Sequence, residues 1–159
     1  MNDVYQINLA KTVFREAYAA GDVDQVLSVF SPAGFTDMSE SLPSKYGEEA
    51  LQEFRRQTEL LFAEYSVKLS VIIIDIVILG STAYDFGWHE WTLTPKSGGP
   101  PVQKRQRYFE LWSKDVALGW RIALFLNNLD VREVVGESRS RWFLSDERQS
   151  KISSGAQGN

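Results

Sequence analysis

The hydrophobic pattern of the chain changes once, near residue 65. Before that point apolar residues recur at three- and four-residue spacing, which is typical of amphipathic helices. After it apolar and polar residues alternate, and β-branched and aromatic residues dominate up to residue 130, which is typical of strands. The sequence therefore predicts helices first and a sheet second.

The first part of the pattern predicts three helices. The first covers residues 3–20 and stops at Gly21. Asp22 supplies a capping oxygen for a short second helix that Pro32 ends. The other elements expected before residue 65 are a brief strand at 34–38, a loop at 39–46 and a third helix that begins at Gly47.

The second part predicts four strands joined by short connections. They are expected at residues 66–79, 82–94, 102–114 and 120–129. Neighbours joined by short connections pair antiparallel. We therefore expect the α+β class, a cone-shaped fold with three N-terminal helices packed on a curved antiparallel β-sheet, and a ligand site in its open mouth.

The first long strand is apolar on both faces. Strict alternation puts Ile72, Ile74, Ile76 and Ile78 on one face and Val71, Ile73, Asp75 and Val77 on the other, so that three of the four residues on the second face are apolar too. A solvated face does not normally carry such residues. We expect the helices to cover one face and a second subunit to cover the other, which gives a homodimer through the outer face.

Length and composition fit one globular domain. The chain has 159 residues, of which 43% are hydrophobic and 24% charged, as in ordinary globular proteins. We expect a single domain over residues 1–130. Residues 131–159 lose apolar content and form a C-terminal extension, either flexible or docked through Trp142.

Charge and residue usage narrow the chemistry. The net charge is -4, and the chain has one histidine and no cysteine. Without a dense Lys/Arg stripe we expect no nucleic-acid binding, and without a long apolar run or signal peptide we expect no membrane and a cytoplasmic location. Metal-ligand spacing and a phosphate loop are both missing, so we expect no metal and no cofactor.

Four stretches carry a family resemblance: AYAAGDVDQVLSVF at 17–30, YGEEAL at 46–51, LGSTAYDFG at 79–87 and GWRIALFLNNLD at 119–130. Their order and spacing resemble the nuclear transport factor 2-like superfamily, also called cystatin-like or SnoaL-like. It includes ketosteroid isomerases and polyketide cyclases. The resemblance implies the cone fold, but this fold hosts enzymes and binding modules alike.

The ketosteroid isomerase pattern is only partly present. Counted from Gly21, the family's oxyanion-donating tyrosine falls on Phe14, and its proton-shuttling aspartate falls on Met38, one place from Asp37. The protonated acid of the family's third strand falls near Tyr108. Because phenylalanine cannot donate a hydrogen bond and methionine cannot carry a proton, that mechanism is not expected here.

The second long strand holds the only histidine. Alternation puts Asp85, Gly87 and His89 on one face, which the resemblance places on the concave side, where Gly87 would leave room for a ligand. The catalytic hypothesis uses His89 as a base, with Asp85, Tyr108 and Asp37 as further catalytic residues. The alternative is that His89 and Glu90 are partly exposed residues near the strand end, with the tryptophans burying a dimer face.

The resemblance also implies a pocket for a small apolar ligand. We expect its lining to include Phe14, Tyr18, Met38, Trp91, Glu110 and Asn127, although these aromatic side chains could equally be plain core. Two functions follow. One is binding of a small apolar molecule or cofactor-independent proton transfer on it, of the isomerase, cyclase or dehydratase type; the other is a non-catalytic ligand-sequestering or homo-oligomeric assembly module.

Overall fold

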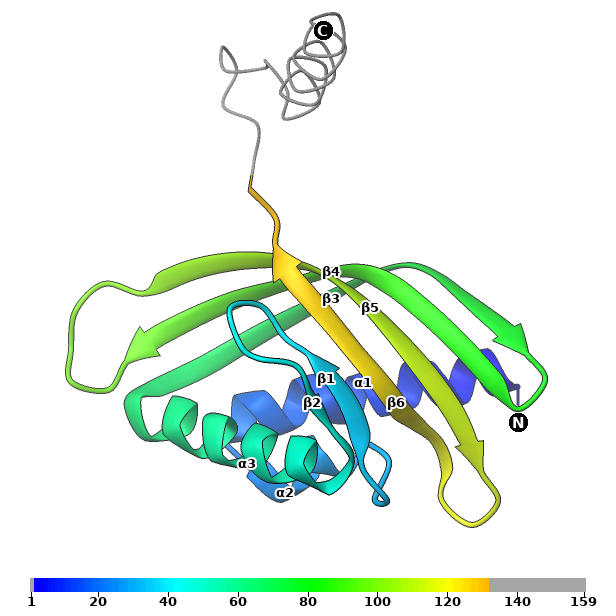
Figure 1. The fold of residues 1–159 in the computed structure, drawn as a ribbon. Helices are drawn as coiled ribbons and strands as arrows, with labels where there is room; N and C mark the ends of the chain where they lie inside the picture. The colour runs from blue at the N-terminus through cyan, green and yellow to red at the C-terminus, as the bar shows by residue number, and fades with distance from the viewer. Residues whose placement is uncertain (1, 132–159) are drawn as a thin grey trace, which may run out of the picture.

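The computed structural model describes residues 2–131, which form helices packed under one curved sheet (Figure 1). The elements in chain order are α1 (Asp3–Ala20), α2 (Val23–Leu27), β1 (Phe35–Met38), β2 (Lys45–Tyr46), α3 (Gly47–Glu64), β3 (Tyr65–Leu79), β4 (Thr82–Pro95), β5 (Val102–Asp115) and β6 (Gly119–Leu129). This order confirms the predicted α+β class.

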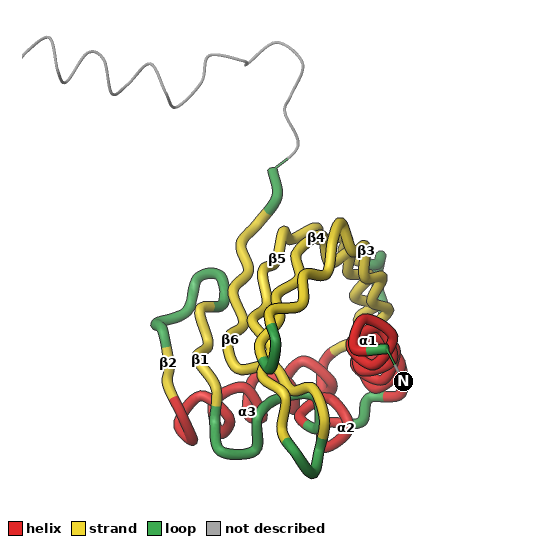
Figure 2. Tube along the Cα trace, turned by 90° about the vertical axis from the view of Figure 1, so that its right-hand side faces the viewer, coloured by secondary structure: helices red, strands yellow, loops and turns green. Residues whose placement is uncertain are grey.

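The sheet has the strand order β2-β1-β6-β5-β4-β3. β3 to β6 pair antiparallel as their short connections predict, whereas β1 joins β6 in parallel. Figure 2 shows the sheet bent around the helices, with α1 beside β3 and α3 beneath β1 and β2. The inward side chains of β4, β5 and β6 therefore lie in the interior of the cone.

Local signals set the ends of the helices. Asn2 caps α1 by accepting from the Val4 amide (2.8 Å), and Gly21 ends it with a left-handed φ of 70°. The second helix ends at Leu27, earlier than predicted. The reason is tertiary, because Phe30 is 1% exposed and bridges to Ile122 of β6.

Two residues of the expected loop at 39–46 form a strand instead. Lys45 and Tyr46 make up β2, which pairs antiparallel with β1 at the sheet edge. A two-residue strand has no periodicity that a sequence pattern can show. The pairing leaves only a short connection between β1 and β2.

A β-bulge overturns the predicted alternation of β3. The register with β4 shifts between Ile73 and Asp75, which leaves Ile74 unpaired. One extra residue moves every later side chain to the other face. As a result Val71 packs inward before the bulge and Ile76 after it, while Ile74 is 53% exposed on the outer face.

Gly87 does not make room for a ligand, contrary to the expectation. It pairs with Ile73 at the bulge, and a Cβ built on it would lie 1.9 Å from the backbone oxygen of Ile72. Only glycine lets the two strands approach this closely. Gly87 therefore accommodates the bulge of the neighbouring strand.

The predicted extension at 131–159, with its anchor at Trp142, lies outside the described residues except for Val131. Within residues 2–131, neither long helix is apolar enough to span a bilayer.

Candidate functional site

The inward face of β4 carries two buried polar residues. Asp85 and His89 are both fully buried, which confirms that this face looks into the cone. Across the sheet, Glu110 of β5 pairs with Asp85, and Tyr108 pairs with Gly87. The two strands thus bring four polar side chains into the interior.

Asp85 is held by three donors. The Tyr108 hydroxyl donates to Oδ2 and the Trp112 indole N–H donates to Oδ1, both over 2.7 Å. Lys11 of α1 places Nζ 2.8 Å from the same Oδ2. These contacts compensate the loss of water around a buried carboxylate.

Lys11 is one cation between two acids. Its side chain is only 4% exposed, and Nζ also contacts Oε2 of Glu110. The ammonium lies 4.0 Å from the centre of the Tyr108 ring, a cation–π contact. Two ionised acids facing one lysine would leave an unbalanced charge in the core.

The other oxygen of Glu110 faces the histidine. Oε1 of Glu110 lies 3.9 Å from Nε2 of His89, too far for a direct hydrogen bond. Among residues 2–131 neither this oxygen nor either ring nitrogen of His89 has a hydrogen-bond partner. The imidazole stacks on the Tyr108 ring, with 4.2 Å between ring centres.

Burial decides the protonation states of this pair. Burial raises the pKa of Glu110 to about 8. The positive charge of Lys11 opposes this increase, and the negative charge of Asp85 adds to it. Burial also lowers the pKa of His89, and the positive charge of Lys11 lowers it further. At neutral pH a protonated Glu110 and a neutral His89 leave Lys11 and Asp85 as one balanced ion pair.

The retained proton predicts a pH-dependent stability. The folded chain keeps the Glu110 proton that the unfolded chain releases near the ordinary pKa of 4.5. The Glu110 contribution is complete below that pKa and is lost as pH rises towards 8, whereas His89, whose pKa is lowered, stabilises the folded chain increasingly as pH rises through its ordinary value of 6.5. Glu110→Gln mimics the neutral acid and removes the first contribution alone, so the free energy of unfolding should change less unfavourably with rising pH than in the wild type.

Urea unfolding at about pH 5 and about pH 8 measures the effect. Glu90→Gln is the matched control, because Glu90 lies half-exposed on the other face of β4 in a pair with Arg105. It should keep the wild-type pH dependence. An unchanged dependence in Glu110→Gln would show that Glu110 does not hold the proton.

A separate cleft lies between α1, α3 and the inner side of the sheet. Its volume is about 250 Å³, and β1, β4, β5, β6, α1, α3 and the segment after β1 form its walls. The lining residues are Tyr18, Asp37, Ser39, Glu40, Leu42, Phe54, Gln57, Thr58, Leu61, Trp91, Lys104, Gln106, Phe125 and Asn127. Six of these fourteen residues are aromatic or aliphatic and eight carry polar or charged side chains, so the cleft offers both apolar contacts and hydrogen-bonding groups to a ligand.

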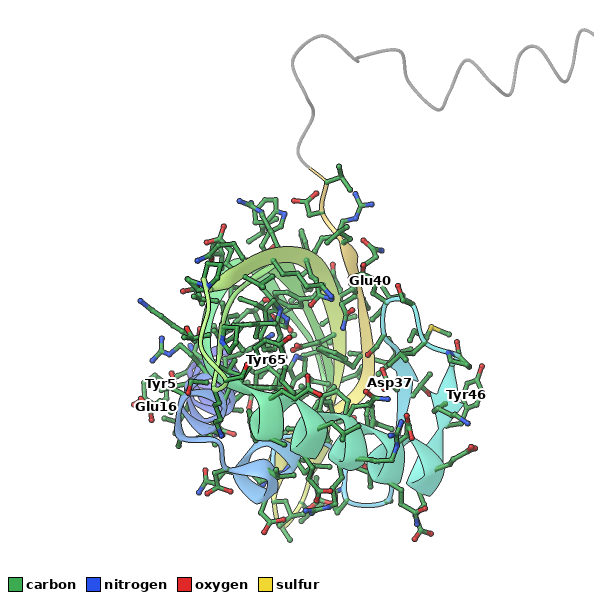
Figure 3. The ribbon with its side chains drawn as sticks, turned by 90° about the vertical axis from the view of Figure 1, so that its left-hand side faces the viewer. Tyr5, Glu16, Asp37, Glu40, Tyr46 and Tyr65 are labelled. Atoms are coloured by element: carbon green, nitrogen blue, oxygen red, sulfur yellow. The ribbon has the colours of Figure 1, made fainter. Side chains whose placement is uncertain are left out.

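Asp37 of β1 is one of the two acids that line this cleft, with Glu40 (Figure 3). It is 5% exposed, and Ser39 donates to its Oδ1 through both the backbone amide and the hydroxyl. Among residues 2–131 no donor reaches Oδ2. Burial raises the pKa of Asp37 above the ordinary value, which makes the carboxylate a stronger base.

Tyr18 brings a hydroxyl to the same cleft from α1. It is 4% exposed and follows Phe14 by one helical turn, with 4.9 Å between the ring centres. Burial raises the pKa of Tyr18, and the charge of Asp37 raises it further, whereas a hydrogen bond with Thr58 opposes this. The phenol therefore keeps its proton and can act as a donor.

Neither a protein-family model nor a curated protein matches the sequence, but solved structures match the fold. A conserved protein from Planctomyces limnophilus is similar with a TM-score of 0.68 and 18% identity, over 80% of this chain and 98% of that one. An NTF2-like superfamily protein from Salmonella enterica gives 0.66 and 17%, over 84% and 95%. This chain has the nuclear transport factor 2-like fold.

A ketosteroid isomerase-like protein from Erwinia carotovora atroseptica shares the fold as well. Its TM-score is 0.66 at 17% identity, over 79% of this chain and 95% of that one. At identities this low the structural similarity establishes a common fold but not a common chemistry.

In this NTF2-like fold some of the predicted site residues line the cleft and the others lie in the buried interior. Asp37, Tyr18, Trp91 and Asn127 lie in the cleft. Met38 follows Asp37 on β1 and points to the opposite face, outside the lining of this cleft.

The other predicted residues lie deeper. His89, Asp85, Tyr108 and Glu110 form the buried cluster with Lys11, and Phe14 is 1% exposed in the core. His89 is separated from the cleft by lining residues, since its ring centre lies 5.9 Å from that of Trp91 and 6.1 Å from that of Phe125. Within residues 2–131 no three His, Asp or Glu side chains form a metal-binding group.

Sequence reasoning missed Lys11 and Gln106. Lys11 stands between Ile7 and Phe14 at helical spacing, and a lysine in the apolar stripe of a helix is itself a signal for a buried ion pair. Gln106 shares the inward face of β5 with Tyr108 and Glu110. The same alternation that placed His89 could have placed it.

Proposed function

We propose that the chain binds a small, largely apolar molecule in the cleft and moves a proton on it without a cofactor. The observation that carries this is Asp37, a buried carboxyl whose Oδ2 is free for a ligand. Aromatic walls from Trp91 and Phe125 surround it. A base with a raised pKa in a cleft with aromatic walls suits isomerase, cyclase or dehydratase chemistry.

The proposed step starts at a carbon next to a carbonyl group. The Asp37 carboxylate takes a proton from this carbon, and the C–H electron pair moves through the new C=C bond onto the oxygen, which becomes an enolate. Tyr18 donates a hydrogen bond to that oxygen. The ketosteroid isomerase pattern has its donor at the position of Phe14, and Tyr18 lies one helical turn after it. Asp37 then returns the proton to the same carbon or to a conjugated one, which completes an isomerisation.

The buried cluster has a positioning role in this proposal. Asp85, Tyr108 and His89 lie behind the cleft wall, and His89 packs against Trp91 and Phe125. A fixed wall keeps the ligand aligned with Asp37. The similar Erwinia protein, named ketosteroid isomerase-like, supports proton transfer as the reaction class.

Filling the cleft tests the binding step. Calorimetric titration with 2-tetralone, a bicyclic enolisable ketone, should show binding to the wild type. Gln57→Trp places a large ring at a cleft-lining position of α3 and should abolish it. Leu60→Trp is the matched control, because Leu60 of the same helix is 49% exposed, away from the cleft. Equal binding by both variants would exclude this cleft as the site.

The outer sheet face supports a homodimer, and with it the alternative of a non-catalytic assembly module. Ile72, Ile74 and Phe109 are 40%, 53% and 36% exposed there, and Phe109 stacks on Tyr84 with 5.6 Å between ring centres. Apolar residues grouped on one sheet face are typical of subunit interfaces. We propose that a second copy covers them.

Light scattering at micromolar concentration should therefore give the mass of a dimer. Ile74→Lys places a charge in the proposed interface and should shift the mass towards the monomer. Leu60→Lys, on the exposed side of α3, should leave it unchanged. A monomeric wild type would exclude the dimer and the assembly module with it.

A further inference from the structure

One acidic side chain of the protein reaches into the cleft from the segment after β1. Oε2 of Glu40 accepts a hydrogen bond from Nε2 of Gln106 (2.8 Å) and lies 3.4 Å from Nζ of Lys104. The Glu40 side chain is only 19% exposed, and its backbone amide donates to Oδ1 of Asn127 (3.0 Å). Figure 3 shows Glu40 above Asp37, beside the sheet.

The groups that hold this carboxylate are oriented in advance. Gln106 is 7% exposed, and its Oε1 accepts from the indole N–H of Trp91 (2.9 Å). Its Nε2 also donates to Oδ1 of Asn127 (3.2 Å). With Oε1 fixed by Trp91, the amide must present N–H donors to the cleft.

We infer that these groups form a carboxylate subsite, and that the ligand of the cleft is an apolar molecule carrying an acidic group. Glu40 occupies the subsite in the ligand-free protein. A buried amide donor and a lysine ammonium together match a carboxylate, and a charge-assisted hydrogen bond is stronger than a neutral one. This inference rests on the proposed function, because it names the substrate class of the same cleft.

Displacement of the Glu40 carboxylate breaks its contacts with Gln106 and Lys104. The segment between β1 and β2 is short, and it contains Ser41, whose φ of 62° lies in the left-handed region. Leu42 of the same segment is 42% exposed and lines the cleft. The carboxylate and its segment lie outside β1 and β2, so its displacement does not require the strand pairing or the wall at Trp91 to change.

The orientation of the ligand follows from the positions of the charges. Lys104 and Gln106 lie two residues apart on the same face of β5, with Lys104 39% exposed and Gln106 buried. The acidic group of the ligand therefore lies on the solvent side, next to Lys104. The apolar body lies deeper, between Trp91 and Phe125, where Asp37 can reach it.

Two probes of similar shape test the inference: 2-naphthoate, which carries a carboxylate, and 2-tetralone, which is neutral. Glu40→Ala frees the subsite and should raise the affinity for 2-naphthoate about tenfold, whereas Lys104→Met should lower it about tenfold. Because both residues line the cleft, the readout is the preference between the two probes, and either variant should change the affinity for 2-tetralone much less than that for 2-naphthoate. Lys68→Met removes a lysine from the exposed face of β3 and is the matched control.

The outcomes separate the two levels of the proposal. If 2-tetralone binds and neither Glu40→Ala nor Lys104→Met changes the preference between the probes, the carboxylate subsite is wrong while the proposed function stands. If neither probe binds to the wild type or to Glu40→Ala, the proposed function fails and the subsite with it. If the preference for 2-naphthoate over 2-tetralone increases in Glu40→Ala and decreases in Lys104→Met, the result supports both the carboxylate subsite and the proposed function.

Discussion

Replacing Lys11 with methionine should lower the free energy of unfolding by about 3–5 kcal/mol, the range for breaking a buried ion pair from one side. Methionine has a similar length but leaves Asp85 without its cation in a fully buried position. It also removes the cation above the Tyr108 ring. Urea unfolding at neutral pH measures the loss.

Lys114→Met is the matched control for this experiment. Lys114 also pairs with an acid, Asp3, at 2.6 Å, but its side chain is 40% exposed. Water screens such a pair, so the variant should change stability little. If both variants cost the same, burial of the Lys11 cluster contributes nothing to the stability of the fold.

The elements of the fold follow from local patterns almost completely. The helix predicted at residues 3–20 coincides with α1, and the four predicted strands agree with β3 to β6 to within one residue at each end. Periodicity and turn residues are encoded locally, so a single sequence shows them. The end of the second helix was predicted too late, because Phe30 bridges to Ile122, which lies far along the chain.

The bulge in β3 could not be predicted from the sequence pattern. Residues 71–74 are Val-Ile-Ile-Ile, so the slip at Ile74 exchanges one apolar residue for another, and the one polar signal is Asp75, which strict alternation puts on the apolar face of Val71 and Ile73 and which the bulge leaves exposed. The counterpart of the bulge, Gly87, was visible but ambiguous, because a strand glycine indicates either a bulge or a close approach by a ligand or another backbone. Only the backbone of Ile72 decides between these readings.

The sequence pattern predicts which face of β4 looks inward but not how the candidate residues group in space. Alternation and family register placed Asp85 and His89 inward, and the structure confirms this. The depth of each residue depends on the curvature of the sheet, which a sequence pattern does not contain. That curvature places Asp37 at the open cleft and His89 behind its wall.

If Asp37 is the base, as we propose, its removal should have the largest effect on the proposed proton transfer. Asp37→Asn keeps the shape and the contacts with Ser39 but cannot take a proton, so the rate should fall by about 10²- to 10⁴-fold. Tyr18→Phe removes the proposed donor to the enolate and should cost about a hundredfold. Tyr46→Phe is the control, because Tyr46 is 61% exposed on the edge strand.

The most direct test is the exchange of the α-protons of 2-tetralone for deuterium in D₂O, followed by nuclear magnetic resonance. Wild type and Tyr46→Phe should accelerate exchange above the buffer rate, and Asp37→Asn and Tyr18→Phe should lose most of this acceleration while still binding the ketone. Exchange at the buffer rate in the wild type, or an equal acceleration in Asp37→Asn, would contradict proton transfer by Asp37 in this cleft.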